Sequence, residues 1–130
     1  LQKRIDIAEA ADADVLLSIH LNEYRSREES GPQVFYQHGS DQGRLLAGTL
    51  QQALLNGLKP SRERSGLAGD YYVLGGTMPS VLVECGFLSN PREEARLLDP
   101  AYQQKIGQAI ANGLEAYEVL LARTGQEDAA

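Results

Sequence analysis

Two apolar segments of the sequence are each followed by a side chain that can do acid–base or metal chemistry. Val15–Ile19 is followed by His20, and Val81–Val83 is followed by Glu84. Both segments are rich in β-branched and other apolar residues, which is typical of buried strands. Ligands of parallel α/β sheets lie at the carboxyl ends of the strands. We therefore expect His20 and Glu84 to emerge together at one edge of a sheet.

The residue types alone leave several roles open. Neutral imidazole is a common metal ligand, but His20 could equally be a hydrogen-bonded histidine at the end of a strand. Glu84 could act as a general base, as a second ligand, or as the partner of a basic side chain. A catalytic zinc site needs three protein ligands, and these two residues do not complete one. His38 follows a different strand and is a weaker candidate ligand.

The single cysteine raises a second kind of chemistry. Cys85 directly follows Glu84, so a cysteine hydrolase with His20 as the base is one alternative. However, successive side chains of a strand point to opposite faces. Cys85 should therefore share a face with the apolar residues Val81 and Val83, and we expect it in the core.

Composition narrows the class of protein. The chain has 130 residues, of which 42% are hydrophobic and 23% charged, enough for one globular domain. A net charge of −6 argues against nucleic acid as the main partner. No apolar run approaches the roughly 20 residues that span a bilayer. The run Arg62-Glu63-Arg64 is expected to be a solvated loop, with contact to an acidic substrate as the alternative.

Periodicity and capping signals divide the chain into alternating elements. The expected helices cover residues 1–11, 41–56, 91–98 and 100–122, and the expected strands cover 15–19, 33–36, 71–74 and 81–83. The last helix should bury one stripe, formed by Ile106, Ile110, Leu114, Tyr117 and Leu121. This order predicts an α/β fold with a mixed, largely parallel sheet flanked by helices on both faces. Residues 1–122 would form the domain, and 123–130 a polar, frayed tail.

The two motifs together resemble a known family. Ser18-Ile19-His20-Leu21-Asn22 and Val83-Glu84-Cys85-Gly86-Phe87-Leu88-Ser89-Asn90 are similar to two signatures of the zinc-dependent N-acetylmuramoyl-L-alanine amidases, called amidase-3. Their order and their separation of about sixty residues also match. The resemblance covers nearly the whole chain and is greatest to the germination-specific, CwlD-type amidases of spore formers. It implies the amidase-3 (phosphorylase/hydrolase-like) fold.

The resemblance also implies a reaction and roles for individual residues. The family hydrolyses the amide between N-acetylmuramic acid and L-alanine in peptidoglycan, with zinc held by a His, a Glu and a second His. His20 matches the second His, and Glu84 matches the catalytic glutamate. Asn22 is a candidate contact to substrate. The first His and the Glu ligand have no match here and are expected in an absent N-terminal part, because the chain opens at Leu1 inside a helix.

We therefore expect residues 1–122 to be the C-terminal portion of an amidase catalytic domain. Peptidoglycan would be its partner, and the site of action would be outside the cytoplasm, in the cell envelope or the spore. Two alternatives remain open: a metal-free wall-binding module with the same fold, and a truncated, inactive fragment. Only about ten residues, 23–32, join the first two strands, which is too short for an inhibitory helical insertion.

Overall fold

Four helices, four strands and one 3-10 turn build the domain. The computed structural model describes the backbone of residues 1–129 and the side chains of residues 1–125. The elements are α1 (Gln2–Ala10), β1 (Leu16–Asn22), β2 (Gln33–Tyr36), α2 (Asp41–Leu58), β3 (Leu67–Ala68), η1 (Tyr72–Leu74), β4 (Ser80–Phe87), α3 (Pro91–Leu97) and α4 (Pro100–Ala129). Among these elements, no helix combines the length and the apolar composition needed to cross a membrane.

The sheet has the strand order β1-β4-β2-β3. β1 runs parallel to β4 and β2 runs parallel to β3, whereas β2 and β4 are antiparallel. The prediction of a mixed, largely parallel sheet is therefore confirmed. β4 lies inside the sheet, and every one of its side chains except Glu84 is buried. This burial on both faces explains why the strand reads as an almost continuous apolar run.

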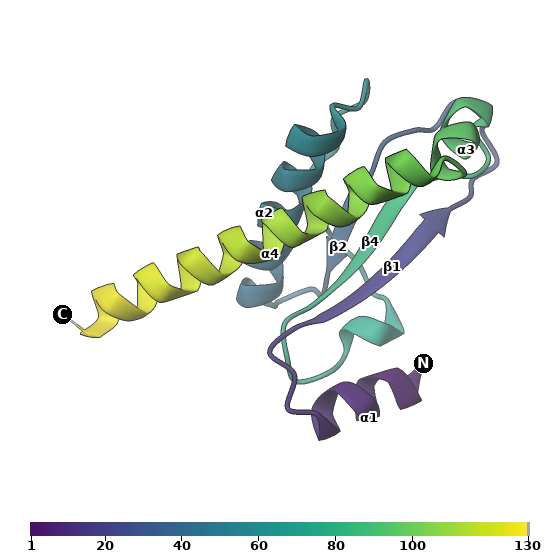
Figure 1. Cartoon of the computed structure of the whole chain (residues 1–130). Coiled ribbons are helices and arrows are strands. Elements are labelled where there is room, and N and C mark those ends of the chain that lie inside the picture. Colours follow the sequence, from purple (N-terminus) through teal and green to yellow (C-terminus); the bar gives the residue numbers. More distant parts are fainter. Residues whose placement is uncertain (130) are drawn as a thin grey trace.

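The two faces of the sheet are covered unequally. α2 and α4 cross each other on one face (Figure 1), where the main core forms around Val83, Leu46, Leu50 and Ile110. On the other face, a smaller cluster joins Leu82 to Val73 and Leu74 of η1. The short helix α1 packs against η1 rather than across the strands (Figure 1). Helices were expected on both faces, but the two long ones share a single face.

α2 and α4 approach closely because glycines stand at their contact. A Cβ on Gly57 would lie 3.1 Å from Ala109, and one on Gly113 would lie 2.7 Å from Leu50. α2 was expected to end at residue 56, but the helix continues to Leu58 and is capped by Lys59 in the left-handed conformation. Gly57 thus lies inside the helix and serves its packing against α4. At the start of α2, the Ser40 side chain caps the helix by accepting a hydrogen bond from Gly43 N–H.

Four other expectations about local structure were wrong. Residues 71–74 were expected as a strand, but Tyr72–Leu74 form the 3-10 turn η1, which buries Val73 and Leu74 under the sheet. β3 pairs with β2 inside a stretch that was expected to be loop. α4 continues to Ala129, so the polar segment from residue 123 to 129 is helical. Leu121 is 38% exposed and does not complete the buried stripe.

α3 begins as the sequence predicts and anchors the end of β4. The Asn90 side chain accepts hydrogen bonds from the N–H groups of Arg92 and Glu93, and Pro91 occupies the first turn. The Glu93 carboxylate is buried, and its Oε1 accepts the N–H of Phe87 at 3.0 Å and the N–H of Gly31 at 2.9 Å. One carboxylate thus joins the start of α3, the end of β4 and the loop before β2.

Replacing Glu93 with Ala should lower the free energy of unfolding by about 2–4 kcal/mol, because two buried N–H groups lose a charged acceptor. Chemical denaturation of the intact protein measures this change. Glu94 is exposed one position further along the same helix, so Glu94→Ala should change stability by less than about 0.5 kcal/mol. Equal effects of the two substitutions would contradict the anchoring role of Glu93.

Candidate active site

His20 and Glu84 lie side by side on neighbouring strands. In the parallel pairing of β1 with β4, His20 is the register partner of Glu84. Paired residues of parallel strands point to the same face, here the thinly covered face that also carries Leu82. The two residues belong to the second halves of their strands rather than following them. Side chains 64 positions apart in the sequence therefore share one surface.

Ser18 contacts His20 directly. It lies two positions earlier on β1, on the same face, and its side chain is buried. A hydrogen bond of 2.6 Å joins Ser18 Oγ to Nε2 of His20. This contact occupies one ring nitrogen and fixes the plane of the imidazole. Ser18 was not expected to be a site residue, although its place two residues before a candidate ligand is the signal that could have found it.

Glu84 is half-buried, and one of its carboxylate oxygens, Oε2, is buried without a hydrogen-bond partner. Among buried side-chain nitrogen and oxygen atoms in the described part of the chain, only Glu84 Oε2 has no partner. Burial raises the pKa of Glu84 above its ordinary value, and the neighbouring His20 acts in the opposite direction. An unpartnered buried carboxylate oxygen is unfavourable unless a positive charge, a proton or a water meets it. The site is therefore arranged to receive one of these.

Tyr71 lies close to the Glu84 carboxylate. Burial raises the pKa of the Tyr71 hydroxyl, and the charge of Glu84 raises it further. The ring of Tyr71 packs edge-on against Phe35 at a centroid distance of 5.2 Å. Tyr71 was expected in a strand and was not considered as a site residue. Tyr71 is the extended residue directly before η1, and the sequence did not indicate that η1 replaces a strand there.

Beyond His20, a second group of polar residues continues the same edge of the sheet. Asn22 ends β1, and its side-chain oxygen accepts the N–H of Glu23. Asn22 also lines a hollow together with Arg62 and Arg64. These arginines were expected to be solvated, but the side chain of Arg64 is only 13% exposed and its guanidinium lies over the ring of Phe87. Arg64 is therefore packed into the fold, whereas Arg62 remains largely exposed.

The other candidates lie elsewhere. His38 follows β2, whose end is next to the start of β4 because the two strands are antiparallel. His38 is therefore at the opposite end of the sheet from Glu84, where it pairs with exposed Asp70 at 2.8 Å. Cys85 is buried in the core under α2 and α4, on the face opposite to Glu84. Burial raises the pKa of its thiol to about 11, and nearby Glu84 adds to this effect.

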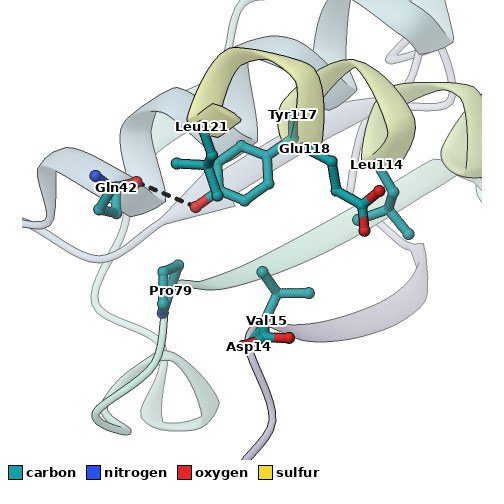
Figure 2. A pocket seen from close by; sticks show the side chains of 8 residues that line it. All are labelled: Asp14, Val15, Gln42, Pro79, Leu114, Tyr117, Glu118 and Leu121. Atoms are coloured by element: carbon teal, nitrogen blue, oxygen red, sulfur yellow. Dashed lines mark hydrogen bonds between the residues drawn. The ribbon is translucent and has the colours of Figure 1, made fainter. Parts of the chain in front are cut away.

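A cavity of about 550 Å³ at the other end of the strands is separate from this site (Figure 2). It is lined by Asp14, Val15, Gln42, Pro79, Leu114, Tyr117, Glu118 and Leu121. The Tyr117 hydroxyl donates a hydrogen bond to Gln42 across it, as Figure 2 shows. Val15 is five residues before His20, about 17 Å along an extended strand. The cavity therefore plays no part in the chemistry of His20 and Glu84.

The residues present supply only part of a metal site. Within the described residues, no group of three or more His, Cys, Asp or Glu side chains could hold a metal ion. A catalytic zinc takes three protein ligands and an open position. His20, with one ring nitrogen held by Ser18, and Glu84, with an unpartnered oxygen, fit the roles of one ligand and one neighbouring base. They do not form a complete ligand set.

Comparison with known proteins identifies the family. Residues 1–116 match Amidase_3, described as N-acetylmuramoyl-L-alanine amidase. The germination-specific N-acetylmuramoyl-L-alanine amidase of Bacillus subtilis is 34% identical over 118 residues, which cover 90% of this chain and 50% of that protein. The amidase LytC of B. subtilis is also 34% identical, over 120 residues that cover 90% of this chain and 24% of LytC.

Solved structures of N-acetylmuramoyl-L-alanine amidases have the same fold as this chain. The CwlD amidase from Clostridioides difficile, determined in complex with the GerS lipoprotein, superposes with a TM-score of 0.88 at 34% identity. That match covers 92% of this chain and 61% of the CwlD chain. The catalytic domain of CwlV from Bacillus (Paenibacillus) polymyxa gives a TM-score of 0.83 at 32% identity, covering 89% and 64% of the two chains.

The chain spans about half the length of the germination-specific relative and under two thirds of the solved amidases above. Within that span, sequence and fold point to the same family that the two motifs resemble, including its CwlD type. The chain belongs to the Amidase_3 family of N-acetylmuramoyl-L-alanine amidases.

Proposed function

We propose that this domain takes part in the zinc-dependent hydrolysis of the amide between N-acetylmuramic acid and L-alanine in peptidoglycan. The observation that carries the proposal is the unpartnered, buried Oε2 of Glu84 beside the imidazole of His20. Bound zinc would supply an electrophile that acidifies water and polarises an amide carbonyl. Completing its ligand set requires groups beyond those of the described residues, namely the expected His and Glu.

His20 is proposed as a zinc ligand. Ser18 engages Nε2, which leaves Nδ1 as the ring nitrogen for the metal. Histidine ligands commonly use their second nitrogen in a hydrogen bond that fixes the tautomer and the orientation of the ring. Because Ser18 is buried on a regular strand, it holds the ring in place before any metal binds. This contact supports the assignment of the imidazole as a preorganised ligand.

Glu84 is proposed as the general base and then the general acid. Its carboxylate takes a proton from the attacking water while the remaining hydroxide adds to the carbonyl carbon. When the carbon–nitrogen bond breaks, Glu84 returns that proton to the departing amine of L-alanine. A carboxylate on a strand whose other side chains are all buried is held near the reacting atoms without any loop movement.

The relatives support the reaction more strongly than a particular biological setting. A germination-specific amidase and LytC are equally similar to this chain, at 34% identity each. We therefore propose that the domain acts in cell-wall remodelling outside the cytoplasm. A role in the spore cortex during germination would be one specific form of this function. The metal-free binding module remains the competing hypothesis. A zinc titration of the complete domain separates the two, since no zinc binding would favour the module.

Glu84→Gln in the full-length protein should retain zinc and lose about 10²–10⁴-fold in turnover of peptidoglycan, because the amide cannot accept a proton. Release of L-alanine amino termini measures the rate, and elemental analysis measures zinc. Glu115→Gln, at an exposed position of α4, is the matched control and should leave both unchanged. Unaltered turnover in Glu84→Gln would remove Glu84 from the mechanism.

Zinc affinity tests the role assigned to His20. His20→Ala should abolish stoichiometric zinc, whereas Ser18→Ala should weaken zinc binding by about 10–100-fold, because the ring loses the contact that orients it. Competition with a chromogenic chelator gives both affinities without any measurement of activity. If Ser18→Ala bound zinc as tightly as the unmodified protein, the hydrogen bond to Nε2 would have no part in ligation.

Cys85 should be unreactive in the folded protein. With a pKa of about 11 instead of 9, its thiolate fraction at pH 8 is about 100-fold lower than in the unfolded chain. Iodoacetamide at pH 8 should therefore label the folded protein at least about 100-fold more slowly than the unfolded one, as mass spectrometry can follow. A cysteine hydrolase would instead show fast labelling together with loss of activity in Cys85→Ser.

A further inference from the structure

Arg64 is built into the fold beside the candidate site. Its Nε donates to the carbonyl of Ser30 at 2.7 Å and its Nη2 donates to Glu29 Oε2 at 2.6 Å. Its guanidinium lies 5.1 Å from the ring centroid of Phe87, the last residue of β4. With its side chain 13% exposed, Arg64 connects the loop before β3 to the loop before β2.

Arg62 is exposed, in contrast to Arg64. Its Nη1 donates to the same Glu29 oxygen at 2.9 Å, but its side chain is 54% exposed. This contact uses one side of the guanidinium and leaves the rest of its donor fork open to solvent. The backbone of Arg62 packs closely against Gly31. A Cβ on Gly31 would lie 2.7 Å from the Arg62 carbonyl oxygen, so the two backbones are held together. Gly31 also has a φ of +93°, which disfavours any other residue.

The two arginines border a hollow next to the catalytic pair. It has a volume of about 310 Å³ and is lined by Asn22, Tyr24, Glu29, Arg62, Arg64 and Phe87. Asn22 is two residues beyond His20 on β1, and Phe87 is three beyond Glu84 on β4, which places the hollow about 7–10 Å along the strands from the pair. An extended peptide advances about 3.3–3.6 Å per residue. A group on the second residue from the cleaved bond, about 7 Å away, reaches the near end of the hollow.

The hollow carries local positive charge in an acidic protein. The hydrogen bond from Arg64 holds the pKa of Glu29 below its ordinary value, with desolvation opposing and the charges of both arginines assisting. Glu29 is therefore ionised and balances one of the two guanidinium groups. Among the residues that line the hollow, one positive charge therefore remains, whereas the chain as a whole carries a net charge of −6. An exposed arginine fork with spare donors is suited to a carboxylate.

We infer that this hollow is the subsite for a carboxylate on the peptide side of the cleaved amide, with Arg62 as its ligand and Arg64 as the positioning residue. The inference rests on the proposed function. In that substrate, the lactyl carboxyl group of the sugar is consumed in the amide, so the free carboxylates belong to the peptide. The position of the hollow selects the residue that follows L-alanine.

Two substrates that differ by one charge test the inference. N-acetylmuramoyl-L-alanyl-D-glutamate with its γ-carboxyl blocked as a methylamide carries one free carboxylate, the α-carboxylate, and the matching D-isoglutamine γ-methylamide carries a carboxamide of the same size in its place. The full-length enzyme should cleave the acid with a kcat/KM about tenfold higher than the amide, mainly through KM, because binding alone is affected. This preference should shrink as salt is raised.

Arg62→Gln should remove that preference by lowering kcat/KM for the acid to about the value for the amide, while Arg62→Lys should keep part of it. Arg44 is an exposed arginine of α2 on the other side of the sheet, so Arg44→Gln should behave like the unmodified enzyme. If Arg62→Gln kept the full preference for the acid, the subsite would be refuted while the amidase function stood. If the unmodified enzyme cleaved neither compound nor peptidoglycan itself, the proposed function and the subsite would fall together.

Discussion

The parallel pairing of β1 with β4 is the constraint on which the rest of the site depends. It sets His20 opposite Glu84, and a slip of one residue in either strand would turn one of the two side chains into the core under α2 and α4. The side chains of β4 point alternately to the two faces of the sheet, and this alternation stabilises the register. Val81, Val83 and Cys85 are buried on one face and fit nowhere else, so the hydrophobic core fixes where the carboxylate of Glu84 points.

Buried polar side chains extend this order to the loops around the site. Gln51 of α2 accepts the N–H of Val34 and donates to the carbonyl of Pro32, which holds the start of β2. Glu93 and Arg64 tie the loop of residues 23–32 to the end of β4 and to the loop before β3. Each of these groups has its partners satisfied. Glu84 Oε2 is the exception in the described structure, and it is the oxygen to which the chemistry is assigned.

The sequence predicted the strands that carry the site because their apolar runs and capping signals are local. The same local signals misplaced Tyr72–Leu74, whose aromatic and β-branched residues resemble a strand but fill the space beneath Leu82 as a 3-10 turn. Tyr71 and Arg64 were missed as neighbours of the site since their contacts depend on how distant segments meet. Ser18 was missed although it lies only two residues from His20 on the same strand. The burial of Glu93 was not predicted either, because it depends on the loop that carries Gly31.

The glycines between α2 and α4 connect a remote surface to the catalytic strands. Gly57 packs against Ala109 of α4, and Gly113 packs against Leu50 and Ala53 of α2, with too little space for a Cβ at either glycine. A side chain at either position would act as a wedge and tilt α4. Ile106, Ile110 and Tyr117 of α4 belong to the same core as Val81 and Val83, so the tilt would reach β4. Larger residues at Gly57 and Gly113 would therefore disturb the alignment of Glu84 with His20 on the far side of the sheet.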